Sequence, residues 1–80
     1  MRMGGLFMAY KAVIYANKTT EGLSVIDINV LDDATGRFLA RPTKSFIDDI
    51  NTVPFLDYER VKQIVSKQYK IPATNISFAK

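Results

Sequence analysis

The 80-residue chain contains no histidine and no cysteine. Without histidine it lacks the side chain that serves most often as a general base, and without cysteine it lacks the thiol nucleophile. The two absences also remove the commonest zinc ligands. The composition therefore predicts no metal, no cofactor and no small-molecule substrate, and the cysteine-free sequence favours the reducing environment of the cytoplasm.

Long apolar runs are absent as well. Gly4, Gly5 and Lys11 interrupt the apolar residues near the start, so the sequence contains neither the core of a signal peptide nor the roughly 18 apolar residues of a membrane span. No periodic pattern precedes Met8, and the glycine pair favours a mobile backbone. We therefore expect a flexible N-terminal lead over residues 1–8 and a single domain over residues 9–80.

The composition that remains is globular, with 48% hydrophobic and 24% charged residues. Residues 9–16 and 23–31 alternate between two faces and are rich in β-branched and aromatic side chains, which is typical of strands. Asp32, Asp33 and Gly36 favour a tight turn before a third strand at residues 37–41, which Pro42 ends. The alternation predicts an inward face made of Tyr10, Ala12, Ile14, Ile26, Ile28 and Val30.

Helical spacing replaces the alternation after Pro42. Ser45 and Asp48 have the spacing of a capping box and predict a short helical turn. Residues 57–69 repeat apolar side chains with the period of an amphipathic helix, with Asp57 as its N-cap, and residues 75–79 alternate again as a short last strand. Tyr15 is the aromatic residue that we expect to be exposed. The aromatic residues expected in the core are Tyr10, Phe38, Phe46, Phe55 and Phe78.

This order of elements predicts an α+β fold of the type β-β-β-α-β. A three-stranded antiparallel meander is followed by the short helical turn, by one amphipathic helix packed on the sheet, and by the short C-terminal strand. A right-handed crossover through the helix would place the last strand parallel to the first or to the third strand.

The second face of this sheet is more apolar than a free monomer usually leaves exposed. The leading hypothesis is therefore a small non-enzymatic binding or accessory module that acts through a protein–protein interface on this open face or on an edge strand. Its partner would be another copy in a homo-oligomer or a different protein. The alternation places Val13, Tyr15, Val25 and Leu39 on this face, beside Lys11, Asp27 and Asn29.

Charge is segregated along the chain although the formal net charge is only +3. Residues 46–59 carry −4 and residues 60–80 carry +5. Cations at helical spacing would form a ridge that contacts phosphates, so a small DNA- or RNA-binding accessory protein is the alternative hypothesis. The same charges also complement the helix dipole without any partner. The residues considered for nucleic-acid contact are Lys11, Arg37, Arg41, Arg60, Lys67 and Lys70.

Acidic residues form a pair at Asp32 and Asp33 and a second group within residues 48–59. Because paired acids can hold Mg²⁺, a divalent-metal-dependent enzyme is a third hypothesis. Adjacent acids on one helix or strand point apart, however, and capping and turn formation account for all of these residues. We therefore predict that the chain is not an enzyme.

Overall fold

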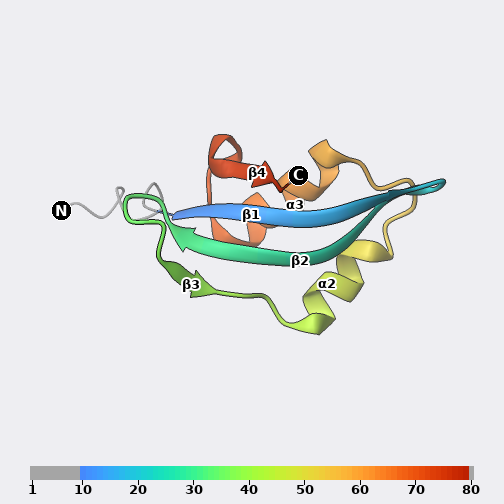
Figure 1. Cartoon of the computed structure of the whole chain (residues 1–80). Helices are drawn as coiled ribbons and strands as arrows, with labels where there is room; N and C mark the ends of the chain where they lie inside the picture. Colours follow the sequence, from blue (N-terminus) through green and yellow to red (C-terminus); the bar gives the residue numbers. More distant parts are fainter. Residues whose placement is uncertain (1–9, 80) are drawn as a thin grey trace.

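Two long strands form the centre of a four-stranded sheet in the computed structural model, which describes residues 10–79 (Figure 1). β1 (Tyr10–Thr19) and β2 (Gly22–Asp32) pair antiparallel. β3 (Phe38–Ala40) pairs antiparallel with β2, and β4 (Ile76–Phe78) pairs parallel with β1, so the strand order is β3-β2-β1-β4. The predicted α+β fold is confirmed, with the last strand beside the first. The predicted lead at residues 1–8 lies outside the described residues.

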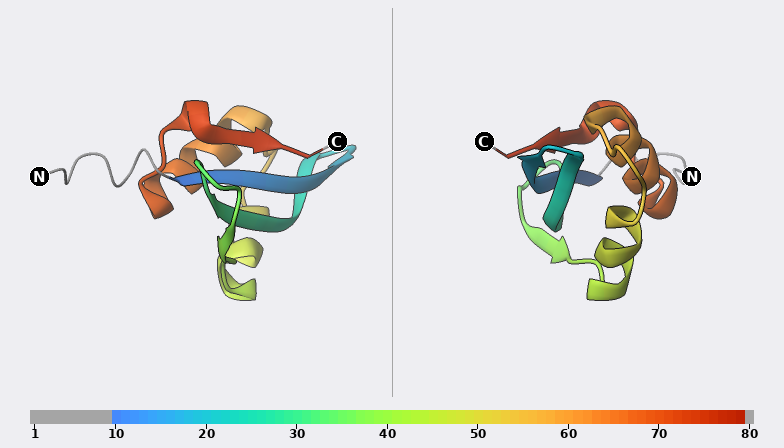
Figure 2. Two further views of the ribbon diagram at one scale, coloured as in Figure 1. Left: turned by 60° about the vertical axis from the view of Figure 1, so that its left-hand side comes forward. Right: turned by 90° about the vertical axis from the view of Figure 1, so that its right-hand side faces the viewer.

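The helices α2 (Lys44–Asn51) and α3 (Tyr58–Tyr69) lie on one side of the β1–β2 hairpin, as the right-hand view of Figure 2 shows. In the described part of the chain no helix is long and apolar enough to cross a membrane. The predicted cap of α3 is confirmed, because the Asp57 carboxylate accepts a hydrogen bond of 2.8 Å from the Arg60 N–H. Lys70, with a left-handed backbone, ends this helix, and the 3-10 turn η1 (Ala73–Asn75) leads into β4.

The predicted cap of α2 is wrong by two residues. Thr43, and not Ser45, precedes the helix, and its hydroxyl accepts a hydrogen bond of 3.2 Å from the Phe46 N–H. Both residues have a short hydroxyl side chain that can cap a helix. Which of the two becomes the N-cap therefore depends on where the chain leaves β3. Phe46, Ile47 and Ile50 then face the core, as the helical spacing predicted.

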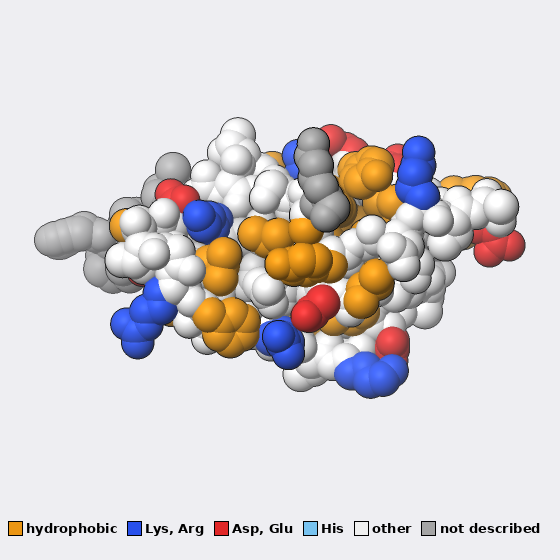
Figure 3. All heavy atoms as spheres, viewed as in Figure 1, with side chains coloured by type: hydrophobic (Ala, Val, Ile, Leu, Met, Phe, Trp, Pro, Cys, Tyr) orange, Lys and Arg blue, Asp and Glu red, His pale blue; other side chains and the backbone are white. Residues whose placement is uncertain are grey.

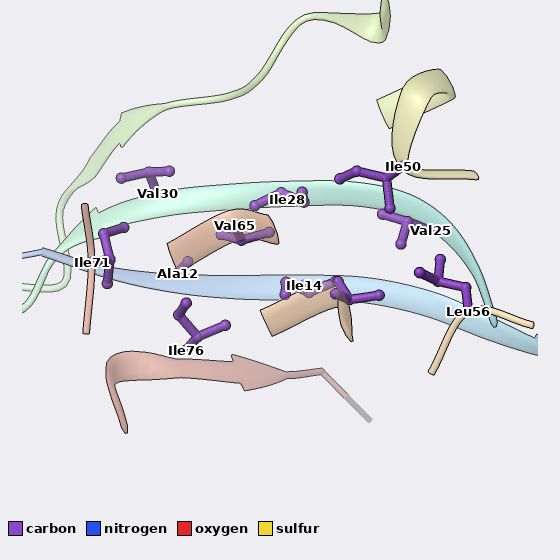
Figure 4. Packing of buried hydrophobic residues seen from close by; sticks show 11 residues of the cluster. Ala12, Ile14, Val25, Ile28, Val30, Ile50, Leu56, Val65, Ile71 and Ile76 are labelled. Carbon is purple, nitrogen blue, oxygen red and sulfur yellow. The ribbon is translucent and has the colours of Figure 1, made fainter. Parts of the chain in front are cut away.

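The core lies between the inner face of the sheet and the two helices (Figure 4). Ile14 and Ile28 are paired across β1 and β2 and are fully buried. Val61 and Val65 lie four residues apart on α3 and cover these strands. Burial of an aliphatic side chain of this size contributes about 1.5–3 kcal/mol. The buried core residues are Ala12, Ile14, Val25, Ile28, Val30, Ile50, Leu56, Val61, Val65, Ile71 and Ile76.

Because of a β-bulge in β2, two residues lie on the opposite faces of the sheet from those predicted. The register shifts between Tyr15 and Ala16, which pair with Asp27 and Val25, so that Ile26 is an extra residue. Because side chains alternate with a period of two, one extra residue exchanges the faces on either side of it. Val25 was predicted on the open face but is 3% exposed in the core, and Ile26 was predicted inward but is 55% exposed.

Two of the five aromatic residues predicted in the core are exposed. Phe38 is 52% exposed because β3 pairs with only the end of β2, opposite Leu31 on the outer side of the sheet. Phe55 is 81% exposed and has a positive φ of 54°. The other three, Tyr10, Phe46 and Phe78, are partly buried and pack against the core as predicted.

Side-chain and backbone contacts from the helical layer occupy the edge of β2 beyond the end of β3. The Asn51 side chain takes the place of a neighbouring strand, since its Oδ1 accepts from the Val25 N–H at 2.7 Å and its Nδ2 donates to the Val25 carbonyl at 2.9 Å. The Leu56 carbonyl accepts from the Leu23 N–H at 2.9 Å. This part of the edge is therefore closed to an added strand.

Candidate functional site

The sheet face opposite α2 and α3 carries a group of apolar side chains. In register, Val13 and Tyr15 on β1 alternate with the core residues and lie opposite Asn29 and Asp27 on β2. Figure 3 shows this face, with hydrophobic side chains gathered over the middle of β1 and β2. We call the group the outer patch and define it by Val13, Tyr15, Ile26, Leu31 and Phe38.

Several large apolar side chains on this side of the sheet and on β3 are exposed. Tyr15 is 40% exposed, and Ile26 and Phe38 are each about half exposed. Leu39, which follows Phe38 in the chain and is the extra residue at an irregularity in β3, is 42% exposed. At roughly 200 Å² for a large side chain, these four residues expose about 400 Å². That area lies within the range of the largest patch on a typical monomer, which is often a functional surface.

Charged groups of both signs lie on the same face. The Arg41 Nε lies 3.5 Å from the Asp27 Oδ2, and the Arg41 guanidinium lies 5.7 Å from the centre of the Phe38 ring. Asp27 is half-buried, and Arg41 is exposed, so this ion pair contributes little stability in an isolated chain. Lys11 lies opposite Leu31 toward one end of the face. The acid on this face is therefore neutralised by a cation of the same chain.

Asn29 lies in the middle of the outer face, opposite Val13. Its Oδ1 is buried and has no hydrogen-bond partner among the described residues. A buried polar atom without a partner costs about 1–3 kcal/mol. Polar bonding on this face is thus incomplete in the isolated chain.

The structure separates the six residues considered for nucleic-acid contact into two groups. Lys11, Arg37 and Arg41 lie on the outer face or around β3. Arg60 and Lys67 on α3, with Lys70 at its end, belong to the layer on the other side of the sheet. No single surface therefore joins the ridge on α3 to the cations near β3.

The acidic residues do not converge. Within residues 10–79 no three His, Cys, Asp or Glu side chains lie close enough together to hold a metal ion. Asp57 caps α3, Asp32 accepts from the turn N–H groups of Ala34 and Thr35, and Asp48 lies 3.3 Å from the Lys44 Nζ. Capping, turn formation and a surface ion pair thus account for these three carboxylates.

One surface groove, of about 650 Å³, lies where the β1–β2 turn meets the segment between α2 and α3. Glu21 is the one ionisable side chain in its lining, which otherwise offers hydroxyl, amide and aliphatic groups and the ring of Phe55. A second groove of about 440 Å³ lies between β2 and α2 and contains Asp27, Arg41, Lys44 and Asp48. Neither lining pairs a nucleophile with a general base in the way that covalent catalysis needs.

Sequence reasoning found part of the outer patch and missed the rest. Of the residues predicted for a protein interface, Val13 and Tyr15 belong to the outer patch, Leu39 is exposed on β3, and Val25 belongs to the core. Ile26 and Phe38 were missed, because a bulge and the short pairing of β3 leave no distinct signal in the sequence. Comparison with known proteins adds no relative, since no family model, no curated protein and no solved structure matches the chain.

Proposed function

We propose that this chain is a small non-enzymatic interaction module, working in the cytoplasm, whose outer patch binds the surface of a folded protein. The observation that carries the proposal is the exposed apolar group on the sheet face that the helices leave uncovered.

Aliphatic side chains favour a protein partner over a nucleic acid. Val13, Ile26 and Leu31 offer no ring on which a base could stack, and Arg41 on this face is already paired with Asp27. Protein interfaces, in contrast, combine apolar and polar side chains, and Figure 3 shows hydrophobic side chains beside charged ones on this face.

A second candidate is single-stranded RNA or DNA on the same face. Phe38 exposes its ring 5.7 Å from the Arg41 guanidinium, and Tyr15 exposes its ring on the face that also carries Lys11; rings and cations together can stack bases and contact phosphates. With about three phosphate contacts, log K would fall by roughly 2 to 3 per tenfold rise in salt concentration. Binding with this salt dependence, lost in Tyr15→Ala, would favour the nucleic acid over the protein.

A photoreactive amino acid tests the proposal in living cells of the source organism. It replaces Tyr15 on the outer patch or, as the control, Gln63 on the exposed side of α3. We expect protein adducts from position 15 at several times the yield from position 63. Equal yields at both positions, or adducts that nuclease removes, would contradict a protein interface on this face.

A further inference from the structure

We propose that the protein which covers the outer patch is a second copy of this chain, so that two sheets pack face to face in a symmetric dimer. The inference rests on the proposed function, because it names the partner of the same surface. Two half-apolar sheets that pack with their faces about 10 Å apart form one of the stable layer arrangements of β-structure.

The dimensions of the face match a small dimer. β1 has 10 residues and β2 has 11, so each spans about 33–36 Å at roughly 3.3 Å per residue. Four strands spaced about 4.8 Å apart give a face about 15–19 Å wide, with its outer strands short. Because β3 and β4 have only three residues each, two such faces would bury on the order of 850 Å² in total, which is the size of a weak interface.

Charge on the face is compatible with an identical partner. Arg41 neutralises Asp27 within each chain, so two outer patches meet without an unpaired acid or a cluster of like charges in the centre. Lys11 is half-buried near the N-terminal end of β1, at the rim of the outer face. A patch that binds its own copy must be self-complementary, and the internal ion pair removes the repulsion that two identical unpaired acids would cause.

The absence of native cysteine allows a direct test with single thiols. Ser77 on β4 is exposed and pairs with Val13, so Ser77→Cys places a thiol on the outer face with little change in volume. Ser45 on α2 is also exposed, and Ser45→Cys is the matched control in the helical layer. The rate of alkylation of each thiol is measured as the protein concentration is raised, together with the mass in solution.

The proposal predicts that the mass rises from 9.0 kDa to twice that value. Alkylation of Ser77→Cys should slow by about tenfold when nine-tenths of the chains are dimeric, and alkylation of Ser45→Cys should not change. A mass of 9.0 kDa at every concentration, or slowing at position 45 alone, would overturn the dimer.

The two proposals fail separately in these experiments. A chain that stays monomeric, yet forms adducts with a different protein from position 15, refutes the second copy and leaves the protein interface intact. A chain that forms no adducts there and stays monomeric refutes both.

Discussion

Replacement of Gly22 by alanine should destabilise the fold far more than any other glycine-to-alanine change in the described chain. Gly22 has a φ of +127°, a region that side chains rarely adopt, and a Cβ built on it would lie 2.6 Å from the Leu56 carbonyl oxygen and 2.8 Å from the Leu56 nitrogen. Leu56 cannot move away cheaply, because it is buried in the core and its carbonyl accepts from the Leu23 N–H.

The expected loss follows from these two causes. The backbone conformation alone costs about 1–3 kcal/mol for a residue with a side chain, and forcing the two segments apart weakens a buried contact at about 1–3 kcal/mol more. We therefore expect Gly22→Ala to lower the free energy of unfolding by about 3–5 kcal/mol. An 80-residue domain has only about 4–12 kcal/mol in total, so partial unfolding at 25 °C is within reach.

Gly36 provides the matched control. It also has a positive φ, of +75°, but a Cβ there would meet no atom within 4 Å. Gly36→Ala should therefore cost only the backbone term, about 1 kcal/mol. Urea denaturation followed by far-ultraviolet circular dichroism gives both values. If Gly22→Ala loses no more stability than Gly36→Ala, then the close approach of the β1–β2 turn to Leu56 is not as described.

Three further predictions concern stability. Asn51→Ala should cost about 2 kcal/mol by urea denaturation, because both backbone groups of Val25 lose their partner; a loss no greater than that of Gln63→Ala would contradict this role. Phe55→Gly should raise the unfolding free energy slightly or leave it unchanged, because the residue is exposed and glycine tolerates a φ of 54°; a loss above about 1 kcal/mol would reveal a contact that this account omits. Burial raises the pKa of Tyr69, so the phenol ionises less readily in the folded chain than in the unfolded chain. The free energy of unfolding that is present below pH 10 should therefore fall as the pH rises further. In Tyr69→Phe the alkaline decline, measured by denaturation at several pH values, should be smaller; an unchanged decline would assign it to other groups.

Local sequence patterns were sufficient to predict an element where neighbouring residues alone determine its structure. The period of residues 57–69 and the cap at Asp57 predicted α3 to within a residue, because an amphipathic stripe and a capping carboxylate act locally. The alternation of Ala12 and Ile14 predicted the inner face of β1 for the same reason. The parallel β4 followed from the handedness of a crossover through a helix, which left two positions open.

Long-range contacts determined the features that the sequence did not reveal. The bulge at Ile26 places Val25 on the core face of the sheet and leaves Ile26 exposed. It forms where Asn51, 26 residues further along the chain, binds the Val25 backbone. Phe38 is exposed because β3 has only three residues and pairs with the end of β2. Half of the candidate surface therefore depends on pairing register, which composition and periodicity do not encode.

The molar mass of the chain in solution, as a function of its concentration, distinguishes a dimer through the outer patch from a monomer. Interface area does not fix affinity, so the chain is measured from about 10 µM to about 1 mM. Sedimentation equilibrium should then show a mass that rises from 9.0 kDa toward twice that value across this range, and Tyr15→Lys should remain at 9.0 kDa. A wild-type mass of 9.0 kDa up to about 1 mM, or a dimer that Tyr15→Lys leaves unchanged, would contradict self-association through the outer patch.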